Sequence, residues 1–146
     1  MNVQNKKAYF DYEVIESFEA GIELTGAEVK SIRAGGANFA GARVLLKEDG
    51  AYLVGLNIQQ YKFANMENYD PDRTRRLLLH HKEILEIQTK MRSAGLTLVP
   101  LKLYNKASLV KVQIALVRGK KKFEKRELIK KRDSHLALAR RLKTNR

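Results

Sequence analysis

The chain of 146 residues has no cysteine and no tryptophan, and it has only two prolines and three histidines. Without cysteine it cannot form disulfides, use a thiol in catalysis or bind zinc through thiolates, and three histidines are too few for a metal site made of imidazole alone. No apolar run approaches the ~18 residues of a membrane-spanning helix, and residues 1–14 lack the apolar segment of a secretion signal. We therefore expect a cytoplasmic protein that needs no metal, cofactor or membrane.

Basic residues are in excess, and most of the excess lies near the C-terminus. Residues 1–117 contain 16 basic and 13 acidic residues, whereas residues 118–146 contain 13 basic and 3 acidic ones, so the net charge of +13 divides into +3 and +10. We expect residues 1–117 to form a folded body and residues 118–146 a tail that is flexible in the free protein, because closely spaced cations repel one another and supply no core. Nucleic acid is the favoured partner. A membrane surface is the competing one, but the tail has no aromatic residue after Phe123 with which to insert.

Short apolar segments indicate a protein made mainly of β-strands with short helices. In chain order we predict a strand, a helix, three strands, a helix and two strands, at residues 11–18, 25–35, 44–46, 52–56, 77–79, 82–92, 96–104 and 109–117. Gly21 is expected to end the first strand, Thr25 and Glu28 form a capping box, and Asp49-Gly50 is typical of a hairpin. Pro100 indicates a sheet edge or a bulge. This order predicts a small, partly closed antiparallel barrel of the oligonucleotide-binding type.

No pattern of catalytic residues stands out, so we expect a binding protein rather than an enzyme. The chain has no phosphate-binding loop motif, and Gly35-Gly36 is better explained as the end of a helix. The pair His80-His81 is the strongest candidate for a metal-binding or proton-transfer site. Adjacent residues of a strand point to opposite faces, so the two imidazoles would not meet at one metal or one proton, and a surface or helix-start position is favoured.

Two segments have residues suited to binding RNA. Residues 70–84 place three arginines, Arg73, Arg75 and Arg76, directly before an apolar run. A guanidinium group can donate two hydrogen bonds to the oxygens of one phosphate, although a solvated strand edge explains the pattern equally well. Residues 119–126 place Phe123 among five cations, an arrangement that holds unstacked bases, and the alternative is a disordered basic tail. Further along, residues 128–142 carry apolar residues at roughly helical spacing, so the tail could order as a helix on a partner.

Residues 60–74 are polar and predict a surface loop. The loop contains three aromatic residues, Tyr61, Phe63 and Tyr69, which either pack on the body or present faces for stacking. Packing on the body is the favoured interpretation.

Five stretches of the chain together resemble the bacterial small protein B family, the SsrA-binding proteins that partner transfer-messenger RNA. They are NKKAYFDY (5–12), FEAGIELTGAEVKSIRAG (18–35), DPDRTRRLLLHHKEI (70–84), LTLVPLKLYNK (96–106) and GKKKFEKR (119–126). The resemblance implies an oligonucleotide-binding barrel that grips the tRNA-like domain of transfer-messenger RNA. With the alanyl charge and elongation factor Tu, it would help bring this RNA to stalled ribosomes for trans-translation, in which incomplete proteins are tagged. We expect it to act as a monomer.

The resemblance also assigns residues. It implies that RNA contacts come from Glu19, Leu78, His80, Gly119, Lys120 and Lys121, to which the pattern of residues 70–84 adds Arg73, Arg75 and Arg76. The tail is expected to contact 16S ribosomal RNA near the decoding centre through Phe123, Glu124, Lys125 and Arg126, becoming helical there and sensing that the messenger channel is empty. Two departures concern side-chain hydrogen bonds, because position 80 is often Asn in relatives and position 124 usually Asp. Phe123 stands where relatives often have His or Tyr, which keeps a ring for stacking but loses its polar tip.

Two other functions are compatible with the same residues. The first is a translation-associated barrel that binds ribosomal or structured RNA without a role in rescue. The second is an RNA-processing enzyme, for which His80 and Glu19 would be the reactive groups. Competition between RNAs separates the first from the rescue function, and incubation of labelled RNA with the protein and a divalent metal tests the second.

Overall fold

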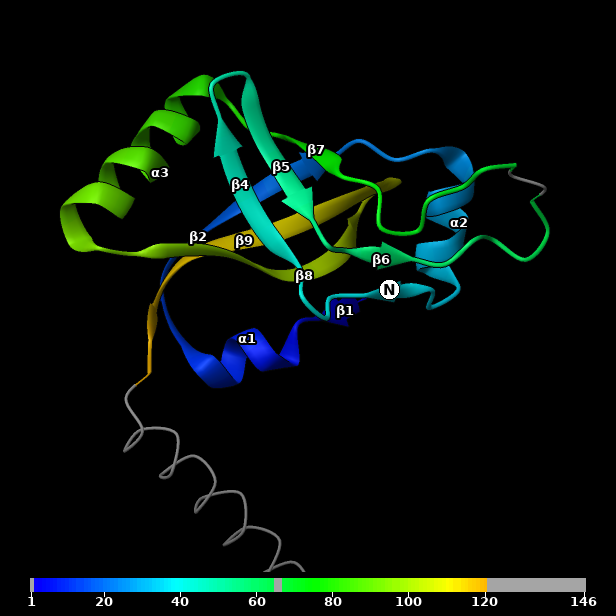
Figure 1. The fold of residues 1–146 in the computed structure, drawn as a ribbon, viewed down its shortest axis with the longest axis horizontal. Helices are drawn as coiled ribbons and strands as arrows, with labels where there is room; N and C mark the ends of the chain where they lie inside the picture. Colours follow the sequence, from blue (N-terminus) through cyan, green and yellow to red (C-terminus); the bar gives the residue numbers. More distant parts are fainter. Residues whose placement is uncertain (1, 65–66, 121–146) are drawn as a thin grey trace, which may run out of the picture.

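The computed structural model describes residues 2–64 and 67–120. These ranges contain nine strands and three helices (Figure 1). In chain order they are β1 (Asn2–Gln4), α1 (Lys6–Asp11), β2 (Tyr12–Ile22), α2 (Gly26–Arg33), β3 (Ala37–Asn38), β4 (Arg43–Lys47), β5 (Gly50–Val54), β6 (Asn57–Ile58), β7 (Arg75–Leu78), α3 (His81–Ala94), β8 (Thr97–Lys106) and β9 (Leu109–Gly119). No helix in the described ranges is long and apolar enough to span a membrane.

Seven strands form one antiparallel sheet in the order β1-β8-β9-β2-β7-β5-β4, and β3 pairs with β6 separately. The sheet curls so that β4 packs against β8, and Figure 1 shows β4 and β5 crossing over β8 and β9. Among the described strands, β1 and β4 are the two ends of the sheet and do not pair with each other. The prediction of a mainly β, antiparallel, barrel-like fold is therefore confirmed, and the barrel is not closed.

The hydrophobic core lies inside the curled sheet, and a smaller cluster lies outside it. Its fully buried residues come from α2, β5, β6, α3, β8, β9 and the turn after β5: Ile32, Ala51, Leu53, Leu56, Ile58, Ile87, Leu103, Val112, Ile114 and Leu116. On the other face of β8 and β9, α1 covers Ala115 and Val117 together with its own Ala8. Residues 114–117 of β9 are all buried. Because consecutive side chains of a strand point to opposite faces, β9 is buried on both faces over this stretch.

Local signals in the sequence correctly predict α2 and the β4–β5 hairpin. At the start of α2 the Glu28 N–H donates to Thr25 Oγ1 at 3.2 Å, and the Thr25 N–H donates to Glu28 Oε1 at 3.0 Å. The hairpin pairs Lys47 with Gly50, so its loop is Glu48-Asp49 and Gly50 begins the next strand. The predicted pairing of two strands is confirmed, but β5 lies at Gly50–Val54 rather than 52–56, and the turn is one residue earlier.

Two features of the N-terminal region differ from the prediction. Gly21 does not end the first strand, because β2 continues to Ile22. A Cβ atom at position 21 would lie 3.1 Å from Cβ of Leu78 on the neighbouring β7, so glycine allows these strands to approach closely. The helix α1 is not predicted at all, since six residues are too few to show an apolar period. It begins at Lys6, and its N-cap is Asn5, whose Oδ1 accepts from the Ala8 N–H at 3.4 Å.

Two of the long strands each have an irregularity in their register. In β2 the register with β9 shifts between Val14 and Glu16, and Val14 and Ile15 at this point are both exposed. In β8 the register shifts between Pro100 and Lys102, which confirms the bulge expected at this proline.

Candidate nucleic-acid interface

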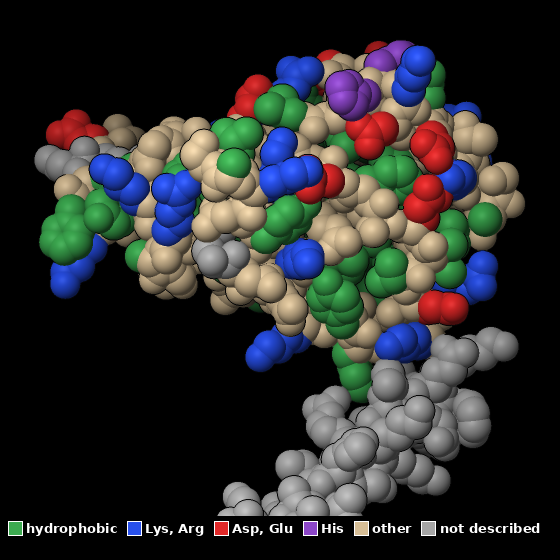
Figure 2. Space-filling view, turned by 180° about the vertical axis from the view of Figure 1, so that it is seen from behind, with side chains coloured by type: hydrophobic (Ala, Val, Ile, Leu, Met, Phe, Trp, Pro, Cys, Tyr) green, Lys and Arg blue, Asp and Glu red, His purple; other side chains and the backbone are tan. Residues whose placement is uncertain are grey.

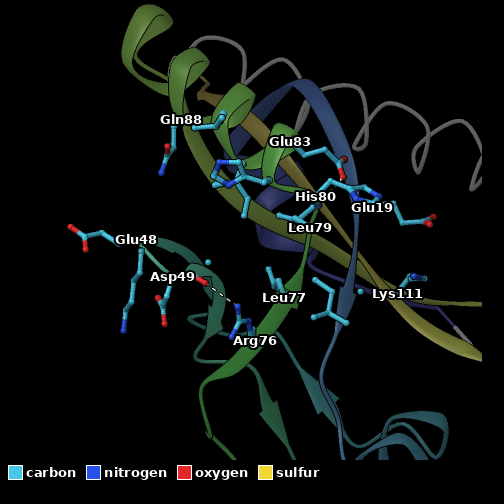
Figure 3. Close-up of a pocket in the computed structure, with 17 residues that line it drawn as sticks. Glu19, Glu48, Asp49, Arg76, Leu77, Leu79, His80, Glu83, Gln88 and Lys111 are labelled. Atoms are coloured by element: carbon cyan, nitrogen blue, oxygen red, sulfur yellow. Dashed lines mark hydrogen bonds between the residues drawn. The ribbon is translucent and has the colours of Figure 1, made fainter.

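A cleft of about 880 Å³ lies where β2, β7, the β4–β5 hairpin and the start of α3 meet. Four residues predicted to contact RNA line it: Glu19, Arg76, Leu78 and His80. Figure 3 shows Glu48 and Asp49 of the hairpin on one side of the cleft and Glu83 and Gln88 of α3 on another. In residues 2–64 and 67–120, no group of three histidine or acidic side chains is placed to hold a metal ion.

The alternation of β7 selects which of its residues reach the cleft. Arg76 and Leu78 are exposed, whereas Arg75 and Leu77 are buried. Adjacent residues of a strand point to opposite faces, so one face of β7 supplies the cleft and the other supplies the core. Arg76 Nη2 donates to the carbonyl oxygen of Asp49 at 2.9 Å, which places its guanidinium at the cleft beside the hairpin (Figure 3).

Glu19 on β2 gives the cleft a fixed negative charge. Its carboxylate accepts from the Tyr104 hydroxyl and, at 3.1 Å, from Lys106 Nζ. The hydrogen bond from Tyr104, followed by that from Lys106, lowers the pKa of Glu19 below its ordinary value. In the same pair, burial and the bond to Glu19 raise the pKa of Tyr104. Glu19 is therefore ionised at neutral pH and acts as a hydrogen-bond acceptor, which suits base N–H groups or ribose hydroxyls rather than phosphates.

His80 occupies the start of α3 rather than a strand. The strand β7 ends at Leu78, and the His80 carbonyl accepts from the backbone N–H of Glu83 at 2.9 Å. This confirms the alternative of a helix-start position. His81 is the first helical residue, and both imidazoles line the cleft. Figure 2 shows the histidines together on the surface, beside basic, acidic and hydrophobic side chains.

Arg75 is not available to RNA, which corrects its prediction as a phosphate contact. Its side chain is fully buried. All five N–H donors of its guanidinium are used inside the protein, with acceptors Glu28 Oε2, the carbonyl oxygens of Leu56, Arg73 and Pro71, and the Tyr69 hydroxyl, at 2.7–3.3 Å. Through these bonds Arg75 joins the segment between β6 and β7 to the body.

Glu28 is the buried partner of two arginines. Its Oε1 accepts from Arg73 Nη2 at 2.6 Å, and its Oε2 accepts from Arg75 Nε at 2.8 Å. Burial raises the pKa of Glu28, but the N–H of Thr25 and the two guanidinium groups outweigh burial and set the pKa below its ordinary value. Arg73 is half-exposed while it makes this bond, so its contact with phosphate stays a prediction.

The ionisation of Glu28 predicts how stability depends on pH. The pKa of Glu28 is lower in the folded than in the unfolded protein. The ionised carboxylate therefore stabilises the fold fully above the ordinary pKa of 4.5, and this stabilisation is lost as the pH falls below that value. We expect the urea midpoint to fall between about pH 6 and about pH 3, and to fall less in the Glu28→Gln variant. Glu13→Gln, at an exposed position of β2, is the matched control. Equal pH dependence in the two variants would contradict this prediction.

Gly119 and Lys120 lie beside α1 rather than in the cleft. The backbone N–H of Lys120 donates to the Asp11 carbonyl, and its Nζ donates to the Tyr9 carbonyl, each at 2.9 Å. The strand β9 runs to Gly119, so regular structure continues two residues past the predicted limit of the body at 117. The remaining predicted contacts lie outside the described residues: Lys121, Phe123, Glu124, Lys125 and Arg126.

Sequence reasoning missed several groups that shape the cleft. Lys111 of β9 and Lys47 of the hairpin line it, and Tyr104 of β8 fixes Glu19. No motif marks these residues, because strands that are distant in the sequence bring them together. The alternation of β9 gave the only usable signal, since it places Lys111 opposite the buried Val110 and Val112.

Comparison with known proteins shows the family to which the chain belongs. The family model described as SmpB protein matches residues 2–144. The SsrA-binding protein of Thermosipho africanus is 51% identical over 143 residues, covering 97% of this chain and 96% of the relative. That of Geotalea uraniireducens is 53% identical over 129 residues, covering 88% and 85%. A solved structure described as "tmRNA-SmpB: a journey to the center of the bacterial ribosome" has a TM-score of 0.68 at 44% identity, covering 83% of this chain and 85% of that one. The chain belongs to the SmpB family.

Proposed function

We propose that the protein binds the tRNA-like domain of transfer-messenger RNA and delivers this RNA to stalled ribosomes for trans-translation. The observation that carries the proposal is that Glu19, Arg76, Leu78 and His80 meet in one cleft of a chain that aligns with SsrA-binding proteins over nearly its whole length. The protein acts by binding and makes or breaks no covalent bond. Because ribosomes are the site of action, its location in this proposal is the cytoplasm.

The chemistry of the cleft suits a folded RNA rather than a regular duplex. The Arg76 guanidinium can pair with a phosphate, Leu78 offers an apolar surface to a base or ribose, and Glu19 accepts hydrogen bonds. The deep groove of an A-form duplex hides base edges from side chains, whereas loops of a tRNA-like fold display them. A cleft that combines basic, acidic and apolar side chains therefore favours a particular RNA shape over bulk phosphate charge.

The finer parts of the proposal concern the tail and the delivery complex. In this proposal residues 118–146 contact 16S ribosomal RNA near the decoding centre, become helical in the empty messenger channel and so sense that the message is missing. The net charge of +10 in this segment supports contact with ribosomal RNA. The body meanwhile holds alanyl-charged transfer-messenger RNA in complex with elongation factor Tu, and one copy of the protein acts as a monomer.

Competition in a gel-shift assay tests the function. We expect the tRNA-like domain to displace a labelled tRNA-like probe much better than a bulk RNA duplex of equal length does. Equal competition by the two RNAs would indicate a general RNA-binding barrel without a role in rescue.

The Leu78→Ala variant tests whether the cleft is the binding site. Leu78 is 52% exposed, and losing a partly buried contact of this size costs about 1–2 kcal/mol, or a roughly 5- to 30-fold rise in Kd for the tRNA-like domain. The matched control is Leu109→Ala, because Leu109 is 59% exposed at the β8–β9 turn and does not line the cleft. A similar loss of affinity in both variants would place the site elsewhere.

A further inference from the structure

The loop that follows β6 exposes an aromatic side chain far from the cleft. Phe63 is 79% exposed, the highest value among the large hydrophobic residues that the structure describes. Its ring packs against Tyr61 in an edge-on arrangement, with centroids 5.5 Å apart and planes at 69°. A single exposed ring is common on protein surfaces, so the case for a partner rests on the groups gathered around Phe63.

Two lysines lie beside these rings. Lys62 Nζ is 5.7 Å from the Phe63 centroid, and Lys30 Nζ, on α2, is 5.9 Å from the Tyr61 centroid. We call these four residues, Lys30, Tyr61, Lys62 and Phe63, the aromatic–lysine tip. Figure 2 shows hydrophobic and basic side chains together at the end of the molecule that carries α2, and Figure 1 places this end opposite α3.

Hydrogen bonds attach the chain to the body both before and after the tip. Before it, Ser31 Oγ donates to the Gln59 carbonyl at 2.5 Å, and the Gln59 N–H donates to the Gly36 carbonyl at 2.9 Å. After it, the Tyr69 hydroxyl donates to the Ile58 carbonyl at 2.7 Å. Next to the tip, the Ala64 N–H donates to the Tyr61 carbonyl at 3.0 Å and closes a turn over Lys62 and Phe63. These bonds order the backbone at the ends of the loop and at the turn, so less backbone freedom is lost when the tip binds a partner.

We propose that the aromatic–lysine tip is a second RNA contact, at which an unpaired base stacks on Phe63 while Lys30 and Lys62 contact the flanking phosphates. A flat exposed ring next to cations is how proteins hold single-stranded RNA without reading its sequence. A protein partner would cover the ring with apolar groups and would leave the lysine charges without a counterpart. The inference rests on the proposed function only in taking RNA as the partner, since none of the tip residues lines the cleft.

Because the chain has no tryptophan, the Phe63→Trp variant carries a single fluorescent reporter at the proposed contact. The probe is a single-stranded oligoadenylate of about eight nucleotides, titrated into the full-length variant at about 0.3 M salt, where electrostatic binding by the basic tail is weak. We expect saturable quenching of the tryptophan fluorescence by about twofold or more, because stacked bases quench indole. The matched control is Leu109→Trp, because Leu109 is 59% exposed at the start of β9 and lies outside the tip.

The lysines give a second readout. Replacing Lys30 and Lys62 by glutamine in the Phe63→Trp background should raise the oligoadenylate concentration at half-quenching. It should also reduce the slope of log affinity against log salt concentration by about the amount expected for two phosphate contacts. Equal quenching in the Phe63→Trp and Leu109→Trp variants, or equal quenching by a duplex, would overturn the inference. Quenching by ribosomal proteins but not by oligoadenylate would also overturn it. If quenching is absent while the preference for the tRNA-like domain persists, this inference fails and the proposed function stands.

Discussion

The Arg75→Ala substitution is expected to lower the free energy of unfolding by about 3–5 kcal/mol, because it leaves the buried Glu28 carboxylate without its main partner. Total stabilities of domains are about 5–15 kcal/mol, so this change removes a large fraction. Urea unfolding followed by far-ultraviolet circular dichroism measures it. The adjacent Arg76→Ala variant is the matched control. Arg76 is exposed and donates one hydrogen bond to the hairpin, so its loss should cost about 1 kcal/mol or less.

A double-mutant cycle with Glu28→Gln shows whether the buried charge causes the loss. Arg75→Ala should cost about 1–2 kcal/mol less in the Glu28→Gln background, since no unpaired carboxylate remains. The RNA affinities should show the opposite order, with Arg76→Ala weakening binding of the tRNA-like domain and Arg75→Ala leaving it unchanged wherever the protein is folded. Equal unfolding free energies for the two single variants would contradict the buried network.

Truncation after Lys120 is expected to abolish tagging of stalled products while preserving most of the affinity for the tRNA-like domain. The cut keeps β9 and the contacts of Lys120 with α1, so the urea midpoint should not change. It removes 11 basic and 3 acidic residues, a net charge of +8, and with them the proposed contact with ribosomal RNA. A reconstituted translation reaction on a message without a stop codon measures tagging.

The control for the truncation is a full-length variant in which residues 121–146 keep their composition in a shuffled order. If charge alone brings the protein to the ribosome, the shuffled tail restores tagging. If the order of residues around Phe123 matters, tagging stays lost. Unimpaired tagging by the truncated protein would refute the division of labour between body and tail.

The sequence predicted the elements whose signals are local. A capping box lies within three residues, and the β4–β5 hairpin needs only a short turn between two apolar segments, so α2 and the hairpin follow from the residues themselves. The position of β9 followed from alternation along residues 109–117, and that of β8 from an apolar segment before the Asn105-Lys106 turn. The short α1 had no period to detect, and Gly21 was misread because its small size serves a contact with Leu78, 57 positions along the chain.

The site was partly predictable for a related reason. The resemblance to a known family assigned Glu19, Leu78 and His80, and the structure brings these residues into one cleft. The arginines could not be separated by sequence, because Arg73, Arg75 and Arg76 have the same chemistry and follow one another closely. Burial decides between them, and the burial of Arg75 depends on Glu28 in another element, which no local pattern reports.

The central pairing of β2 with β9 joins the two ends of the body, with Tyr12 opposite Gly119 and Gly21 opposite Lys111. These partners lie roughly a hundred residues apart, and such non-local pairing forms slowly and late. A nascent chain that stops before Leu109 has β2 and β8 but lacks the strand that joins them, so the sheet is left with unpaired edges at its centre. A prematurely ended copy of this protein is therefore a poor candidate for folding and a ready substrate for aggregation or proteolysis.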